Sequence, residues 1–269
     1  FTLEGGSLRG RYDIASDELI LDQLELAGDR TRIEGEVRVR DVSAIMRAAP
    51  DAPAAFNITL PSMRMAVPAA FAEPVAFSNV QVVGAIEAAG RTIRLTRLSA
   101  HTGDGQLEAS GRVYWAEAGP ERRLYPGVEL NGALAGAVDV SAVMAAWPIG
   151  LGENTRAYLA RALREGRVSD ATIALDVRPS DNAAGVWRNE AVDVRFNVSG
   201  VTLQYISTMA PVQAARGAGV LRGNRFDLTI AEARINDLVI TNGRVEAPRL
   251  RSQGAPGMLS ISGQADGDA

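Results

Sequence analysis

Apolar and polar residues alternate along most of this chain, with the period of two that is typical of strands with one buried face. In the segment 33–40, Ile33, Val37 and Val39 are separated by charged residues, with Gly35 in phase with the apolar set. The same alternation recurs around Ile93 and Leu95; Ile173, Leu175 and Val177; Val192, Val194, Phe196 and Val198; and Phe226, Leu228 and Ile230. Such strands have one apolar and one polar face, so the pattern predicts a mainly β, antiparallel fold.

One decapeptide occurs twice. Residues 41–50 read DVSAIMRAAP and residues 139–148 read DVSAVMAAWP, 98 positions further along. Each copy follows a predicted strand, has capping residues at its start and ends at a proline, which cannot continue a helix. We therefore expect a short helix near 42–49, a second one after residue 139, and an architecture built from internal repeats.

The most helical stretch spans residues 140–166. After Trp147 and Pro148, the segment 153–166 is predicted to be a second helix, with Tyr158 and Leu159 on its packed face and Gly166 at its end. Arg156 lies in the first turn, against the helix dipole. We expect a carboxylate or carbonyl oxygens to hold it, or else that it is free to contact a ligand.

These residues carry a family resemblance. Trp147, Pro148, Arg156, Tyr158, Leu159, Gly166 and Val168 resemble the AsmA-like proteins, in particular the YhdP branch. The resemblance is clearest over residues 127–250; the family has a proline pair where this chain has Ala210-Pro211. It implies a periplasmic, bridge-like lipid transport protein with an elongated β groove and an apolar lining.

Two architectures fit one-sided strands, a two-sheet sandwich and a single curved sheet. The repeat and the scarcity of helix favour the second, an elongated, curved antiparallel groove with a short helical insertion. The predicted parts are a β-repeat segment 1–139, the helical insertion 140–167 and a β-repeat segment 168–269, all in one continuous groove. Five prolines between residues 50 and 74 indicate edge strand and loop. Asn242-Gly243 indicates a hairpin turn.

Composition excludes several classes of function. The net charge of −4 and the pI of about 5.2 argue against a nucleic-acid binder. Without cysteine there is no disulfide framework and no thiolate metal site. The single histidine, His101, is assigned to a surface turn, and no Ser lies in a nucleophile elbow. We therefore expect neither a cofactor, a metal site nor an enzyme.

What remains is the apolar face itself. Its residues are predicted to line a groove for phospholipid or another acyl lipid: Val37, Val39, Ile93, Leu95, Ile173, Leu175, Val177, Val192, Val194, Phe196, Val198, Phe226, Leu228 and Ile230. Trp147, Pro148, Arg156, Tyr158, Leu159 and Gly166 are expected to be structural. The alternative is a structural or protein-interaction β module of the cell envelope with a closed apolar core.

The chain begins at Phe1 in mid-pattern and has no run of about 20 apolar residues. We therefore expect a piece of a longer periplasmic protein that contacts the inner and outer membranes through other parts and is anchored in the inner membrane. As such a piece, it is expected to self-associate through open sheet edges.

Overall fold

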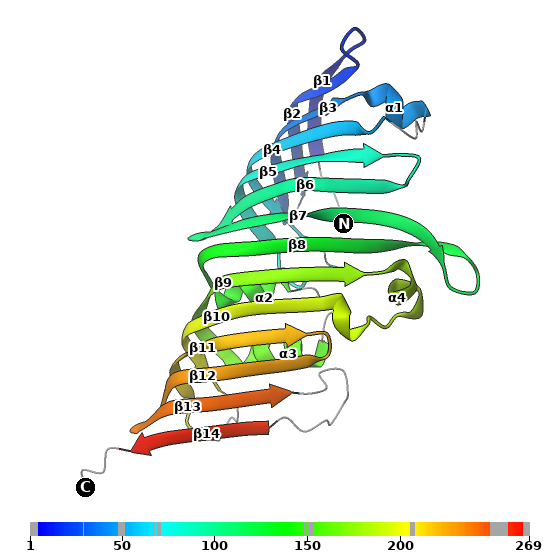
Figure 1. Ribbon diagram of the computed structural model, residues 1–269. Coiled ribbons are helices and arrows are strands. Elements are labelled where there is room, and N and C mark those ends of the chain that lie inside the picture. The colour runs from blue at the N-terminus through cyan, green and yellow to red at the C-terminus, as the bar shows by residue number, and fades with distance from the viewer. Residues whose placement is uncertain are drawn as a thin grey trace.

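The computed structural model describes residues 5–28, 30–47, 52–66, 68, 71–147, 149, 153–204, 208–247 and 258–265. The side chains of residues 153–155, 158, 247 and 258–265 are not described. A single 14-stranded antiparallel sheet dominates this part of the chain, and each strand pairs with the strands before and after it. The predicted fold class, an elongated curved β groove with few helices, is confirmed (Figure 1).

The strands are long, and consecutive ones are joined mostly by tight turns. They are β1 (Gly5–Asp13), β2 (Glu18–Gly28), β3 (Thr31–Arg40), β4 (Ala54–Met65), β5 (Val75–Glu87), β6 (Thr92–Thr102), β7 (Gly105–Ala118), β8 (Arg123–Asp139), β9 (Leu163–Val177), β10 (Val192–Leu203), β11 (Val212–Arg222), β12 (Arg225–Ile235), β13 (Leu238–Ala247) and β14 (Met258–Ala265). Fourteen strands at about 4.8 Å spacing give a sheet about 60 Å wide. β8, with 17 residues, runs about 55 Å along its curve.

Four helices occur in the described chain, and they lie in three of the connections between strands. They are α1 (Val42–Arg47), α2 (Val140–Ala146), α3 (Glu153–Ala162) and α4 (Pro179–Ala184), followed by a 3-10 turn, η1 (Asn189–Ala191). The two copies of the repeated decapeptide form α1 and α2, as predicted. Because β3 and β8 run in opposite directions, these two helices lie at opposite rims of the sheet. The strands curve around α2 and α3, which lie on the inner side (Figure 1).

The second predicted helix is shorter than the sequence indicates. α3 ends at Ala162, and Leu163 already pairs with Leu203 of β10. Gly166 is therefore not a helix cap: it lies within β9, where a Cβ would come closer than 3.0 Å to Val201. Close approach of two strands, rather than helix termination, explains this glycine.

Two other predictions from local signals are wrong. β4 carries Pro61 but is an interior strand, paired with both β3 and β5. The proline is tolerated because it lies where the β3–β4 ladder shifts register, between Glu34 and Glu36. Asn242 and Gly243 do not form a turn but lie inside β13, and the β12–β13 turn falls at residues 236–237.

The outer face of the sheet is ionic. Arg112 donates two hydrogen bonds to Glu129 on the next strand, at 2.9 and 2.6 Å, and its guanidinium lies 4.9 Å from the centre of the Tyr114 ring. Arg40 pairs with Glu18 across β2 and β3, and Arg222 with Asp193 across β10 and β11. Each exposed ion pair contributes only about 0.2–1 kcal/mol to stability. Together, the charged side chains keep the outer face of the sheet hydrated.

The inner face is apolar, and no second sheet covers it within the described residues. The chain exposes 15949 Å² of surface, whereas a compact monomer of 28.4 kDa would expose about 11,200 Å². The core is accordingly divided into separate clusters along the sheet. One is centred on Leu60, Val80 and Ala100, and another on Val212, Ala233 and Ile240.

Glycines on the inner face are covered by aromatic rings from the neighbouring strand. The Phe56 ring lies over Gly84, and the Phe196 ring lies over Gly219. Phe196 also stacks on Phe226, with ring centroids 6.5 Å apart. Missing side chains on the inside of a bend allow curvature, and the rings restore the lost contacts.

Gly219→Ala should destabilise the protein by about 1–3 kcal/mol, because the new Cβ would overlap the Phe196 ring and displace it from its stack. Urea unfolding measures the loss. Phe196→Leu in the same chain should recover part of it, and Gly5→Ala, with no atom within 4 Å of the new Cβ, should be neutral. Equal losses at Gly219 with and without Phe196 would show that the ring is not the cause.

Candidate functional site

The register of the sheet brings all fourteen predicted lining residues to the inner face. Directly paired residues of an antiparallel sheet share a face. One continuous row runs from β1 to β12: Gly10, Leu21, Val37, Ile58, Val82, Leu98, Ala109, Gly132, Ile173, Val194, Leu221 and Phe226. Parallel rows place the other members, such as Leu95, Leu175 and Leu228, on the same side.

Most of these fourteen side chains are partly exposed. Val177, Val192 and Ile230 are buried, at 2%, 1% and 7% exposure, and Ile93 is 38% exposed. The remaining ten are partly exposed: Val37, Val39, Leu95, Ile173, Leu175, Val194, Phe196, Val198, Phe226 and Leu228. A contiguous apolar face that remains partly exposed is a candidate site for binding apolar material.

The sequence reasoning omitted residues of the same face from strands β2, β4, β5, β7, β8 and β11. The row above adds Leu21, Ile58, Val82, Leu98 and Leu221. Their alternation with polar residues was the available signal. This alternation is interrupted where the strands shift register, for example after Leu21 and after Leu95, so the pattern was not followed through these positions.

The α2–α3 segment covers part of this face near one rim. Val140 and Val143 of α2 pack with Val138, Val168 and Phe196 of the sheet, and α2 also contacts β5. Ala162 at the end of α3 is buried, and Leu159 is partly buried. The described parts of these helices thus cover the inner face where α2 meets β5, β8 and β9 and where α3 meets β9.

The predicted structural motif is placed only in part. Arg156 Nε donates a hydrogen bond of 3.3 Å to the Trp147 carbonyl oxygen, which agrees with the prediction that carbonyl oxygens hold this arginine. Trp147 is partly buried at the end of α2. Pro148 and the side chain of Tyr158 lie outside the described residues.

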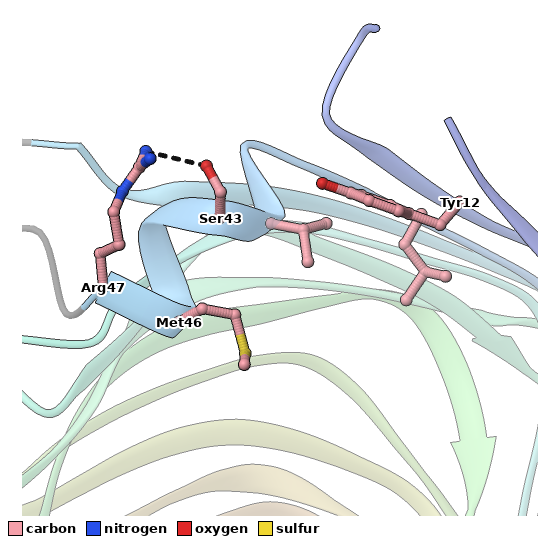
Figure 2. A pocket seen from close by; sticks show the side chains of 6 residues that line it. Tyr12, Ser43, Met46 and Arg47 are labelled. Carbon is pink, nitrogen blue, oxygen red and sulfur yellow. Dashed lines mark hydrogen bonds between the residues drawn. The ribbon is translucent and has the colours of Figure 1, made fainter. Parts of the chain in front are cut away.

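At the other rim, α1 contacts β4, and an open hollow of about 300 Å³ lies between this helix and strands β1 and β2. Tyr12, Leu19, Val42 and Met46 form its apolar walls, and Ser43 and Arg47 complete it (Figure 2). Figure 2 shows Arg47 and Met46 on different sides of the helix, with the guanidinium of Arg47 bonded to Ser43.

A chain of hydrogen bonds attaches α1 to the β1–β2 turn. Asp17 accepts from the Tyr12 hydroxyl at 2.6 Å, the Ser43 hydroxyl at 2.5 Å and the Ser43 amide at 3.1 Å. Arg47 Nη2 donates to Ser43 Oγ at 2.8 Å. The hydrogen bonds from Ser43 and then Tyr12 lower the pKa of Asp17 from its usual value, so it stays ionised at neutral pH.

The connection between β9 and β10 contains a second polar cluster. Asp181 is 5% exposed; its carboxylate accepts from Arg188 Nε, and Arg188 Nη2 donates to the Asp176 carbonyl oxygen. Trp187 Nε1 donates to Asn182, which in turn donates to the Pro126 carbonyl. These bonds tie the β9–β10 connection to the ends of β8 and β9, so we assign the cluster a structural role at this rim.

Other chemistry is sparse in the described ranges. They hold no group of three metal-ligating side chains, and none of their helices is long and apolar enough to cross a bilayer. His101 is not in a surface turn, as the sequence suggested, but in β6, with a buried Nδ1 that has no hydrogen-bond partner among these residues.

Comparison with known proteins gives one match. A family model described as YhdP protein matches residues 28–269. No curated protein and no solved structure is significantly similar to the chain.

The attachment of α1 should be sensitive to acid. Because the folded-state pKa of Asp17 is lowered, its hydrogen bonds stabilise the contact above the ordinary aspartate pKa of about 3.9. This contribution is lost as the pH falls through the lower folded value. NMR titration of the Ser43 amide should show a midpoint below about 3.9, absent in Asp17→Asn. A midpoint at or above that value would contradict the hydrogen-bonded arrangement.

Proposed function

The chain belongs to the YhdP family, and on that premise we propose that it is a non-enzymatic segment of a bridge-like lipid carrier. Its groove would shield the acyl chains of phospholipid, or of another acyl lipid, between the inner and outer membranes. The headgroups would remain in solvent. The setting proposed is the periplasm, with anchorage in the inner membrane through parts of the protein beyond this chain.

The observation that carries the proposal is the continuity of the apolar face. Cross-strand neighbours lead from Leu21 on β2 to Phe226 on β12 without a charged side chain in the row. Most of the fourteen lining residues remain partly exposed. A lipid chain could therefore move from strand to strand without leaving apolar contact.

The energetics favour such a path. Exposing a methylene group to water costs about 0.8 kcal/mol, so a two-chain lipid with about thirty methylenes faces more than 20 kcal/mol in the aqueous gap. Contact with rows of Val, Ile and Leu offsets much of this cost and requires no catalytic group. Because the contacts are non-directional, they allow the lipid to slide as well as to bind.

The competing hypothesis is an envelope module that uses the sheet for protein interaction with its apolar core closed. It requires a layer over the inner face. Within the described residues, α1, α2 and α3 lie over the rims and part of β8–β10, and the single sheet supplies no second layer. This arrangement favours the groove over the closed core.

Val194→Asp should reduce the lipid that co-purifies with the protein about ten-fold or more, because an unpaired charge in the apolar path is costly to bury. Native mass spectrometry measures the bound lipid. The matched control is Ser199→Asp, which introduces the same charge on the outer face of the same strand, opposite Arg167.

Ile93→Asp provides a second test, since this residue is 38% exposed and its change should leave the fold intact. Normal thermal unfolding together with parental lipid loading in both inner-face variants would rule out the proposed path.

Self-association through the sheet edges remains a prediction. β1 pairs with β2 alone, so the other side of its backbone has no partner among the described strands. Sedimentation velocity should show oligomers that grow with protein concentration. A monomer at all concentrations would contradict the prediction.

A further inference from the structure

We propose that the hollow under α1 is a headgroup site: Arg47 binds the anionic group of an acyl amphiphile, and Tyr12, Leu19, Val42 and Met46 contact the start of its acyl chain. The inference rests on the proposed function and adds to it a place where the lipid is recognised by charge.

The hollow is continuous with the groove. Tyr12 pairs with Leu19, Leu19 with Val39, and Val39 with Phe56, so its floor is the first part of an inner-face row. A ligand that enters beside α1 therefore meets the lining residues directly. The rim holds the polar end of the ligand and the sheet holds the apolar end.

The internal repeat shows that Met46, in the apolar wall of the hollow, lacks the packing that the equivalent methionine of α2 has. Met46 of α1 corresponds to Met144 of α2. Met144 is partly buried, in a helix that packs on the sheet, whereas Met46 is 84% exposed. The flexible, polarisable thioether of methionine is well suited to adapt to an apolar ligand.

Arg47 also keeps hydrogen-bond donors at the hollow, although its charge interacts electrostatically with the nearby Asp17 carboxylate. Arg40, on the same rim, pairs with Glu18, but Arg47 forms no ion pair within the described chain. Its one hydrogen bond goes to Ser43 Oγ, and Asp17 is already occupied by Ser43 and Tyr12. Arg47 thus keeps donors for a ligand while Ser43 orients the guanidinium, a group suited to bidentate binding of phosphate or carboxylate.

The apolar walls and the arginine together favour one kind of ligand. A free anion would leave the apolar walls uncovered, and a neutral lipid would leave the guanidinium unmatched. The repeat adds that α2 has Ala145 where α1 has Arg47, so the cation is specific to the hollow and not to the helix motif. An amphiphile with an anionic headgroup satisfies both surfaces.

The absence of native cysteine allows single-site fluorescent labelling. One environment-sensitive label replaces Ile14, an 82% exposed residue in the β1–β2 turn, and in a second protein another replaces Ile93 in the groove. The probes are lysophosphatidylglycerol below its micelle concentration, a monoacylglycerol of the same chain length, and inorganic phosphate.

Both labels should respond saturably to lysophosphatidylglycerol. At the turn label, Arg47→Gln should weaken its binding about ten-fold, as should replacing the probe with monoacylglycerol, because each removes the charge-assisted hydrogen bonds. Phosphate alone should give no response. Arg38→Gln, which alters an exposed arginine on the outer face of β3, is the matched control and should bind like the parent.

Equal affinity of Arg47→Gln and the parent, or equal affinity for the neutral probe, overturns the headgroup site. If the groove label responds and the turn label does not, this inference fails while the proposed function stands. If neither responds, both fail. A turn-label signal that rises with protein concentration in the absence of lipid would assign the hollow to a second copy of the chain and overturn the proposal.

Discussion

The structure depends on every strand placing its apolar side chains on the same face of the sheet. Side chains alternate with a period of two, so a one-residue slip would carry the apolar residues of a strand to the ionic face. The described residues contain no second sheet that would correct such a slip, so pairing with the neighbouring strands is the main determinant of which face each residue occupies. The sequence is itself out of phase in places: Leu95 and Leu98 have opposite parity, yet both lie on the inner face. The register shift between them absorbs the extra residue, as does the shift between Leu21 and Leu24.

The same requirement explains what could be predicted from the sequence. Alternation reports directly which face of a strand is apolar, so the residues chosen from it, from Val37 to Ile230, all lie on one face. Predictions made from single prolines and turn dipeptides were less accurate. Pro61 suggested an edge and Asn242-Gly243 a turn, because such rules assume regular ladders. In this sheet a register shift accommodates the proline, and Gly243 is needed within a strand opposite Ile230.

The α1 hollow could not be predicted from any local pattern. Asp17 stands among acidic residues that resemble a solvated strand edge, and its partner Ser43 is 26 positions away. The repeat did predict both short helices, but it could not show that one packs on the sheet while the other stands over a hollow. That difference arises from the strands each helix meets: α2 contacts β5, β8 and β9, whereas α1 contacts β4 and leaves a hollow toward β1 and β2.

The consecutive strand order also determines how the chain can fold. Every strand finds its partners immediately before and after it in the sequence, so loop closure never spans distant segments, a topology associated with rapid folding. Stability is then approximately a sum of terms between neighbours, as in solenoid proteins. Such a sheet can be assembled one hairpin at a time, from the first strands synthesised, without waiting for the end of the chain.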